Sequence, residues 1–323
     1  MFTLGELEQA LTLVHGSMPP TPQYAWPLLG ERAGCEVWVK HENHTPTGAF
    51  KVRGGLVFLD ELAAGNELPP GFVTATRGNH GQSIPYAAAR FGVPVTVLVP
   101  EGNSREKNRA MRAWGAQLVV HGSDFDEARE EAARLARERG LQFAPSFHPA
   151  LVRGVATYAL ELFRAAPPLD TVYVPIGMGS GICGLITTRD LLGLDTEIVG
   201  VVSSHAPAYA LSVARGSVVQ TNSAQTFADG MACRVPDPAA LAVISAGTAR
   251  ILQVNDDEVA AAMRALFEDT HNVAEGAGAA ALAGLMQEAE RQRGRRVAVI
   301  LTGGNVDRDV FAEVLSGRTP APR

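Results

Sequence analysis

Cysteine is scarce in this sequence, and the lack of cysteine pairs excludes two kinds of site. Cys35, Cys183 and Cys233 are far apart and do not have the spacing of a zinc site or a redox dithiol. Three widely separated cysteines also provide no disulfide framework, which fits a reducing compartment. We therefore expect a cytoplasmic protein.

Excess positive charge and long apolar runs are absent as well. The chain has 28 lysines and arginines against 34 acidic residues, a net charge of −6. It therefore lacks the basic field that attracts nucleic acid or anionic lipid. No apolar run approaches the roughly 20 residues of a membrane-spanning helix, and no cationic leader precedes a cleavage site. We expect neither nucleic acid nor membrane as a partner.

The residues that are present are typical of a globular α/β protein. Hydrophobic residues make up 46% of the chain, with 33 glycines and 20 prolines. Apolar, β-branched runs alternate with helical stretches, and they lie at residues 72–75, 95–99, 117–120, 171–176, 198–202 and 296–301. Because these runs are continuously apolar, they predict parallel sheets covered by helices on both faces.

The predicted strands fall into two groups along the chain. One group lies near residues 70–122 and the other near 170–305, with the proline-bounded segment 145–149 as the crossing point. We predict a larger domain formed by residues 1–68 and 152–323, and a smaller mobile domain formed by residues 69–151.

Lys51 is the most informative residue, because it lies in a Thr-Pro-Thr-Gly-Ala-Phe-Lys segment beside Phe50. An amine in an apolar pocket loses its proton more readily than a solvated one. A neutral amine can form a Schiff base with an aldehyde such as pyridoxal phosphate. From this segment alone, an ordinary solvated lysine remains the alternative.

A glycine-rich loop follows the predicted strand 171–176 and precedes a helical stretch. The loop consists of Gly177, Met178, Gly179, Ser180 and Gly181. Backbone N–H groups of such a loop approach a phosphate closely, and the start of the next helix favours negative charge. A nicotinamide dehydrogenase is an alternative, but the following strand ends in Val-Val-Ser-Ser without the expected acid. Close packing alone is a second alternative.

A second polar segment joins the predicted strand 72–75 to a helix, and it contains Thr76, Arg77, Gly78, Asn79 and His80. Hydroxyl, amide and backbone donors at a helix start suit a carboxylate. The alternative is that Thr76 is an ordinary N-cap. The strand 296–301 ends at Thr302 and two glycines, a position where ligands of parallel sheets bind, although turn chemistry also explains it.

Taken together and in this order, the four segments resemble the fold-type II pyridoxal-phosphate enzymes. Within that family they are similar to the threonine and serine dehydratases and the serine racemases, over roughly residues 20–312. The resemblance implies two parallel-sheet α/β lobes with pyridoxal 5'-phosphate between them. It also implies a homo-oligomer, either a dimer or a tetramer.

The resemblance assigns a role to each segment. Lys51 would carry the cofactor as a Schiff base, with Phe50 beside the ring and the amides of residues 177–181 on the phosphate. Asn79 would bond the ring hydroxyl, and Thr302 would face the pyridine nitrogen. The loop from Thr76 to His80 would bind the substrate carboxylate and close over the substrate.

These roles predict β-elimination from a small amino-acid substrate. Lys51 would take the α-proton while the cofactor acts as the electron sink. A neutral hydroxyl at the pyridine nitrogen favours prompt elimination over transamination. We predict dehydration and deamination of L-threonine or L-serine to a 2-oxo acid and ammonia. The alternatives are phenylserine or 3-hydroxyaspartate dehydration, serine racemisation, and a noncatalytic cofactor-binding relative.

The sequence departs from the family pattern at three points. Arg77 stands where racemases carry a serine, and Met178 and Ser180 interrupt the four-glycine phosphate loop. Gln225 stands where metal-binding members have a glutamate, so Asp229 alone is poor evidence for a divalent ion and we expect no metal. Arg77 could pair with a second substrate carboxylate, or turn outward to a surface acid.

Overall fold

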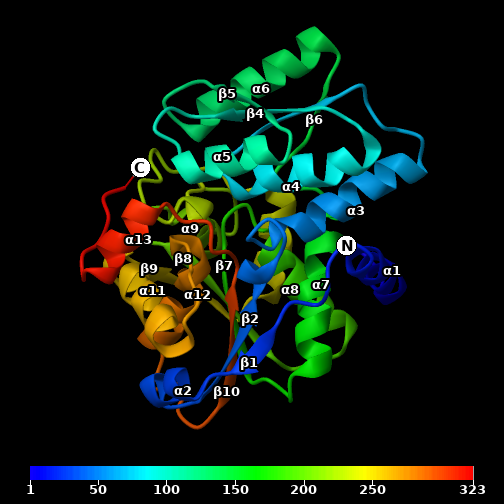
Figure 1. The fold of residues 1–323 in the computed structure, drawn as a ribbon. Helices are drawn as coiled ribbons and strands as arrows, with labels where there is room; N and C mark the ends of the chain where they lie inside the picture. The colour runs from blue at the N-terminus through cyan, green and yellow to red at the C-terminus, as the bar shows by residue number, and fades with distance from the viewer. Residues whose placement is uncertain (323) are drawn as a thin grey trace.

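The computed structural model describes residues 1–322 and contains two sheets, one above the other in Figure 1. The larger sheet has the order β1 (Gln23–Ala25), β2 (Glu36–His41), β10 (Arg296–Leu301), β7 (Thr171–Pro175), β8 (Glu197–Ser203) and β9 (Arg250–Val254). The smaller sheet has the order β5 (Gln117–Val120), β4 (Val95–Val99), β3 (Phe72–Ala75) and β6 (Gln142–Phe143). Every strand pair is parallel except β1 with β2.

Helices surround both sheets. The first half of the chain contributes α1 (Leu4–His15), α2 (Pro27–Ala33), η1 (Glu42–His44), α3 (Lys51–Ala64), α4 (Asn79–Ala88), η2 (Ala89–Phe91), α5 (Arg105–Ala113), α6 (Phe125–Arg139) and α7 (Pro149–Ala165). The second half contributes α8 (Ser180–Leu191), α9 (Ala208–Arg215), η3 (Asp229–Met231), α10 (Pro238–Gly247), α11 (Asp256–Thr270), α12 (Gly276–Gln287) and α13 (Arg308–Leu315).

The predicted fold class is confirmed, and all six predicted apolar runs are strands. The sequence did not indicate β1, β2, β6 and β9. The first and third of these have only three and two residues, too short for a periodic pattern. β2 carries Lys40 and His41 at its end, and β9 is only half-buried, so neither presents a continuous apolar run.

The larger sheet is buried on both faces, as continuous apolar strands require. In β10, Val297, Val299 and Leu301 belong to the core that contains α11 and α12. Ala298 and Ile300 belong to the opposite core, formed with α7 and α8. Burying one such side chain contributes roughly 1.5–3 kcal/mol, so the alternation fixes the register of the strand.

The smaller sheet has its own cores. Helix α6 packs on one face, with Ala128 and Leu135 against Val73. Helix α3 packs on the other face, where Leu56 lies in the same cluster as Phe72. Because Lys51 is the first residue of α3, this packing places the lysine between the two sheets.

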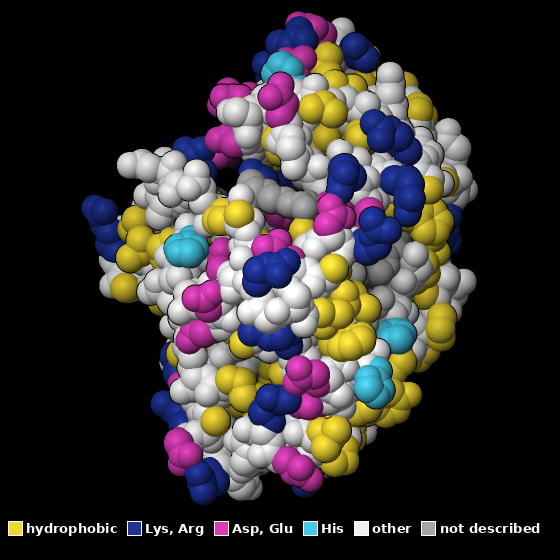
Figure 2. Space-filling model, turned by 60° about the vertical axis from the view of Figure 1, so that its left-hand side comes forward, with side chains coloured by type: hydrophobic (Ala, Val, Ile, Leu, Met, Phe, Trp, Pro, Cys, Tyr) yellow, Lys and Arg dark blue, Asp and Glu magenta, His cyan; other side chains and the backbone are white. Residues whose placement is uncertain are grey.

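Helix length and surface charge bear on membrane and polyanion binding. Among residues 1–322, no helix is long and apolar enough to cross a bilayer. Figure 2 shows acidic and basic side chains interspersed over one face of the molecule.

Candidate active site

One cavity brings all the predicted site residues together at the carboxyl ends of β3, β7 and β10. The predicted residues that line it are Phe50, Lys51, Thr76, Arg77, Gly78, Asn79, His80, Gly177, Met178, Gly179, Ser180, Gly181 and Thr302. The carboxyl edge of a parallel sheet is where ligands bind in α/β folds. The position of these segments in one cavity therefore agrees with the sequence analysis, while their individual roles stay predictions.

Lys51 points into this cavity from the start of α3. Its Nζ donates a hydrogen bond to Ser180 Oγ at 2.9 Å and lies 4.8 Å from the centroid of the Phe50 ring. Burial disfavours the charged amine and lowers the pKa of Lys51 to about 8. Near neutral pH the amine is therefore far more often uncharged than that of a solvated lysine.

The loop between β7 and α8 forms a backbone cradle. Gly179 caps α8 with a φ of 96°, in the left-handed region that favours glycine. A Cβ on Gly177 would lie 2.2 Å from the Gly230 carbonyl oxygen, and one on Gly181 would lie 3.5 Å from the Phe50 ring. Met178 and Ser180 do not prevent this geometry, because the loop still ends in the N-terminus of a 12-residue helix.

The segment from Thr76 to His80 forms the entry into α4. Thr76 Oγ1 accepts a hydrogen bond from Gly78 N at 2.9 Å, whereas the N-cap of α4 is Gly78, without a side-chain cap. The alternative interpretation of Thr76 as the N-cap is therefore wrong. Burial, and then the charge of Lys51, lower the pKa of His80 to about 3, so its imidazole is neutral in the cavity.

Asn79 lies at the first position of α4, and both ends of its amide are bonded. Its Nδ2 donates to Glu275 Oε1 at 2.5 Å, and its Oδ1 accepts from Asn305 Nδ2 at 2.9 Å. Asn305 Nδ2 also donates to the carbonyl oxygen of Thr47 at 2.8 Å, in the segment that leads to Lys51.

Thr302 lies just beyond β10 and is 4% exposed. Its carbonyl oxygen accepts a hydrogen bond from Phe50 N at 3.0 Å, and its Oγ1 lies 3.5 Å from the Ala277 carbonyl oxygen. The end of β10 and the lysine segment are thus joined by backbone hydrogen bonds.

Three charged residues of the cavity, Lys107, Asp229 and Glu275, had no catalytic or binding role in the sequence analysis. Lys107 Nζ, from α5, lies 2.8 Å from each carboxylate oxygen of Asp229 and 2.9 Å from Glu275 Oε2. Burial opposes the charge of Lys107, but the two carboxylates raise its pKa. Lys107 lies in the polar sequence Arg-Glu-Lys-Asn-Arg, which reads as a solvated helix face. Only the packing of α5 against the other lobe reveals its position.

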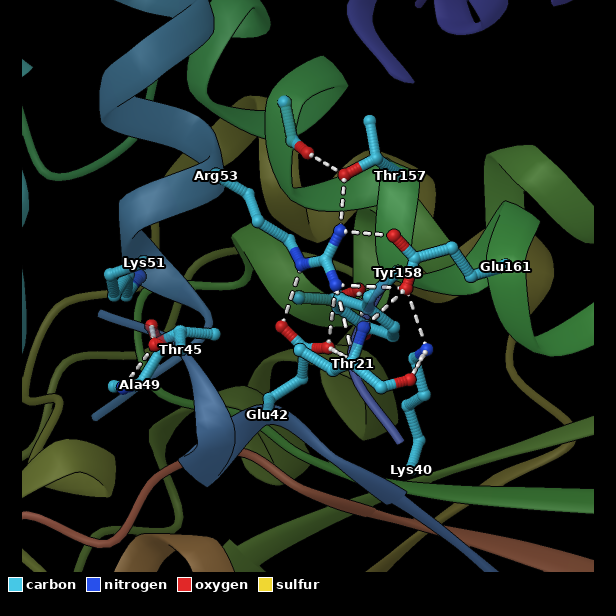
Figure 3. Close-up of polar contacts among 12 residues, drawn as sticks. Thr21, Lys40, Glu42, Thr45, Ala49, Lys51, Arg53, Thr157, Tyr158 and Glu161 are labelled. Atoms are coloured by element: carbon cyan, nitrogen blue, oxygen red, sulfur yellow. Dashed lines mark hydrogen bonds and ion pairs between the residues drawn. The ribbon is translucent and has the colours of Figure 1, made fainter. Parts of the chain in front are cut away.

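A second buried charge cluster lies behind the lysine. Arg53 points away from Lys51 and donates to Glu42 Oε2 and Glu161 Oε1, each at 2.7 Å (Figure 3). Lys40 Nζ donates to Glu161 Oε2 at 2.6 Å. Two cations thus balance two carboxylates, each at most 6% exposed. The cluster ties the first turn of α3 to β2, η1 and α7.

Arg77 and Gln225 both line a hollow next to the cavity. Arg77 is partly exposed and lines both the inner cavity and an adjoining hollow. Gln225 lines only the adjoining hollow, whereas Asp229 lines the inner cavity. Within residues 1–322, no three His, Cys, Asp or Glu side chains are grouped as a metal site would require.

Comparison with known proteins agrees with this geometry. Residues 15–303 match a family model described as pyridoxal-phosphate dependent enzyme. The L-threonine ammonia-lyase of Thermotoga maritima is 31% identical over 98% of this chain and 79% of its own length. The L-threo-3-hydroxyaspartate ammonia-lyase of Saccharomyces cerevisiae is 30% identical over 99% of this chain and 98% of its own.

A solved structure also superimposes on this fold. The processed form of threonine deaminase isoform 2 from Solanum lycopersicum has a TM-score of 0.88 and 28% sequence identity, covering 98% of this chain and 94% of that one. The family match removes the alternative of a nicotinamide dehydrogenase and makes pyridoxal 5'-phosphate the cofactor. The chain therefore belongs to the pyridoxal-phosphate dependent enzymes, within the fold-type II group of threonine and serine dehydratases and serine racemases.

Proposed function

We propose that this protein is an ammonia-lyase that dehydrates and deaminates a β-hydroxy amino acid, with L-threonine and L-serine as the first substrates. The products are a 2-oxo acid and ammonia. The observation that carries the proposal is the position of the Lys51 amine, which lies in one cavity with the glycine loop 177–181. Burial there lowers the pKa of Lys51 to about 8. The 31% identity with an L-threonine ammonia-lyase over 98% of the chain supports the reaction class.

The residues of the cavity fit the cofactor. At Gly177 and Gly179 a Cβ would meet the Gly230 carbonyl oxygen at 2.2 Å and Ala240 Cβ at 2.8 Å, so glycine is needed for the loop to pack here. The loop leads into the positive end of α8, which favours a phosphate. We assign the phosphate to the loop formed by Gly177, Met178, Gly179, Ser180 and Gly181. Lys51 would bond the aldehyde carbon, with Phe50 beside the ring. Asn79 would bond the ring hydroxyl, and Thr302 would face the ring nitrogen.

The segment from Thr76 to His80 is assigned to the substrate carboxylate. Thr76, Arg77, Gly78, Asn79 and His80 lie at the N-terminus of α4, where backbone N–H groups and the helix dipole favour an anion. The neutral imidazole of His80 adds no charge of its own. The loop therefore orients the substrate through hydrogen bonds and excludes water when the lobes approach.

Lys51 then serves as the base and the acid of the reaction. When bound, the cofactor supplies an electron sink for the α-carbon. The freed amine of Lys51 takes the α-proton, which its lowered pKa allows, and Ser180 Oγ lies 2.9 Å away to hold Nζ in place. Lys51 returns this proton to the departing β-hydroxyl, which leaves as water. The unsaturated amine that remains reacts with water to give the 2-oxo acid and ammonia.

A panel assay tests the proposal. Purified protein incubated with pyridoxal phosphate should release ammonia and 2-oxo acid in equal amounts from L-threonine or L-serine. Lys51→Ala should lose turnover and the visible absorption of the bound cofactor together. A coloured, folded protein that releases no 2-oxo acid from any β-hydroxy amino acid would instead identify a noncatalytic relative.

A second substrate is favoured by one observation, the guanidinium of Arg77 at the border between the cavity and the adjoining hollow. Its planar donors suit a second carboxylate, as 3-hydroxyaspartate would present. The yeast relative that shares nearly its full length with this chain is named for that substrate. Phenylserine lacks the second carboxylate and would gain nothing from Arg77. Serine racemisation is disfavoured, because Arg77 occupies the position of the racemase serine.

We also propose the organisation of the protein in the cell. The four-stranded sheet and helices α4 to α6 lie within residues 69–151, which supports a smaller mobile domain beside a larger one of residues 1–68 and 152–323. Helix α3 packs against the smaller sheet and would act as its support. A cytoplasmic homodimer or homotetramer is the expected form, and light scattering of purified protein tests the oligomeric state.

A further inference from the structure

Lys107 spans the space between the two sheets. Helix α5 packs with α4 and β5 of the smaller sheet, whereas Glu275 precedes α12, which packs on β7 and β8 of the larger sheet. The Lys107 side chain is 5% exposed and that of Glu275 is 3% exposed. An ammonium so deeply buried is stable only because Asp229 and Glu275 compensate its charge.

A chain of hydrogen bonds continues from this ion pair to the lysine segment. Glu275 accepts from Asn79 Nδ2, Asn79 Oδ1 accepts from Asn305 Nδ2, and Asn305 Nδ2 also donates to the Thr47 carbonyl oxygen. A backbone carbonyl can only accept, so the Thr47 end fixes the direction of the Asn305 amide. Asn305 Nδ2 in turn fixes the direction of the Asn79 amide, and an ionised Glu275, which can only accept, agrees with that direction.

The direction of the Asn79 amide decides what it offers to the cavity. Its Nδ2 carries two hydrogens, and Glu275 takes one of them. The other remains for a ligand in the cavity that Asn79 lines. Asn305 Nδ2 already holds Asn79 Oδ1 from the other side, so a protonated Glu275 could set its own hydrogen against Nδ2 and weaken that contact. An ionised Glu275 therefore keeps both contacts of the amide consistent and Nδ2 firmly held as a donor.

We propose that Lys107 is a positioning residue that keeps Glu275 ionised and so holds the Asn79 amide as a hydrogen-bond donor toward the ring oxygen of the cofactor. Lys107 reaches Glu275 past Gly78, where a Cβ would lie 2.3 Å from Lys107 Cδ. The Lys107 side chain thus passes directly beside Gly78, the residue before Asn79. Lys107 and Glu275 belong to opposite lobes, so their ion pair forms only when the lobes are close together. The orientation of the Asn79 amide is thereby coupled to the approach of the lobes.

The inference rests on the proposed role of Asn79, and the experiment separates the two. Pyridoxal phosphate is titrated into the apoprotein, and its dissociation constant and visible absorption maximum are measured. Lys107→Met should weaken binding about tenfold, or ~1.4 kcal/mol, and shift the absorption maximum. Arg105→Met is the matched control, because Arg105 on the same helix pairs with Asp309 across the lobes at the exposed surface. It should leave both quantities unchanged.

Lys107→Met alone leaves buried carboxylates without their cation and could impair folding. A double variant that also removes the charge of Glu275 provides a second test. Lys107→Met combined with Glu275→Gln removes a charge of each sign and retains an acceptor for Asn79. It should bind the cofactor within about threefold of the wild-type protein. Equal effects of Lys107→Met and Arg105→Met, or a double variant no better than Lys107→Met, would overturn the inference. Should Asn79→Ala leave binding and spectrum unchanged, the proposed role of Asn79 itself fails.

Discussion

Lys51 Nζ donates a hydrogen bond to Ser180 Oγ, 2.9 Å away on the first turn of α8. The reactive amine and the glycine cradle, 129 residues apart in sequence, are thus in direct contact. Ser180 is 2% exposed, so its hydroxyl has few partners other than this amine and a ligand in the cradle. We derive the first prediction from this contact.

Ser180→Ala removes one acceptor from the Lys51 amine and one hydroxyl from the cradle. We expect about three- to tenfold weaker binding of pyridoxal phosphate to the apoprotein, the usual loss for one hydrogen bond. Fluorescence titration measures it. Ser212→Ala is a suitable control, since Ser212 is also a buried helical serine but lies on α9 and bonds only local backbone groups. Equal losses in both variants would contradict the prediction.

The rate at which the apoprotein takes up pyridoxal phosphate should depend on pH through Lys51. Only the neutral amine attacks an aldehyde, and burial lowers the pKa of Lys51 to about 8. Below that pH the neutral fraction falls about tenfold per pH unit, and above it the fraction levels off. Stopped-flow absorbance between pH 6 and 10, referenced to free lysine with the same aldehyde, should show the rate levelling near pH 8, whereas the rate for free lysine is still rising there. A rate that still rises steeply above pH 9 would mean a solvated lysine.

Arg77→Ala should discriminate between substrates. If Arg77 binds a second carboxylate, kcat/KM for 3-hydroxyaspartate should fall by about 10- to 100-fold, the range for a charge-assisted hydrogen bond. Turnover of L-threonine should change little, because its methyl group offers nothing to a guanidinium. Arg77→Lys should recover only part of the loss, since a point charge replaces a planar fork. Equal losses on both substrates would remove the second carboxylate site.

Gly78→Ala should lower the free energy of unfolding more than an alanine at another glycine with positive φ. Gly78 has a φ of 156°, and its Cβ would lie 2.3 Å from Lys107 Cδ. Gly102 has a φ of 69° with open space around the Cβ position, so Gly102→Ala reports backbone strain alone. That strain is worth about 1–2 kcal/mol. Chemical denaturation should show a larger loss for Gly78→Ala, and comparable losses would mean that Lys107 moves aside freely.

The cluster behind the lysine should govern stability at low pH. Arg53→Met takes the guanidinium from the carboxylates of Glu42 and Glu161 and leaves Glu161 with Lys40 Nζ and His15 Nε2. Breaking a buried pair in this way costs about 3–5 kcal/mol. Despite burial, which acts in the opposite direction, Arg53 and Lys40 lower the pKa of Glu161 to about 2. The resulting stabilisation is complete above the ordinary glutamate pKa of 4.5 and is lost as the pH falls toward 2. Urea denaturation at several pH values should show this loss in the wild-type protein and a smaller one in Arg53→Met.

The sequence predicted those parts of the molecule that local patterns encode. Continuous apolar runs gave the strands on either side of the site, and the glycines after Pro175 and the lysine after Phe50 marked the loops. It did not predict Lys107 or the Arg53 cluster. Each depends on contacts between residues more than 100 positions apart, such as Lys107 with Asp229 and Arg53 with Glu161. A charged residue in a polar stretch carries no local sign that a distant helix will cover it.

Short and edge elements escaped prediction for a different reason. β1 and β6 derive their structure from pairing with β2 and β3, because two or three residues cannot show a period. Glu275 stands directly before α12, and the helix dipole alone explains an acid there. Its bond to Asn79 and its place in the cavity lining appear only in the structure.

The backbone hydrogen bonds between residues 48–50 and residues 302–304 bear on how substrate specificity could change in this enzyme. Phe50 N bonds the Thr302 carbonyl oxygen, Gly304 N bonds the Gly48 carbonyl oxygen, and Ala49 pairs with Gly303. These backbone contacts hold Lys51 and Thr302 in a fixed relation to each other. Arg77 takes no part in these contacts, so under the proposed roles a substitution there would change the preferred amino acid without displacing Lys51 or Thr302.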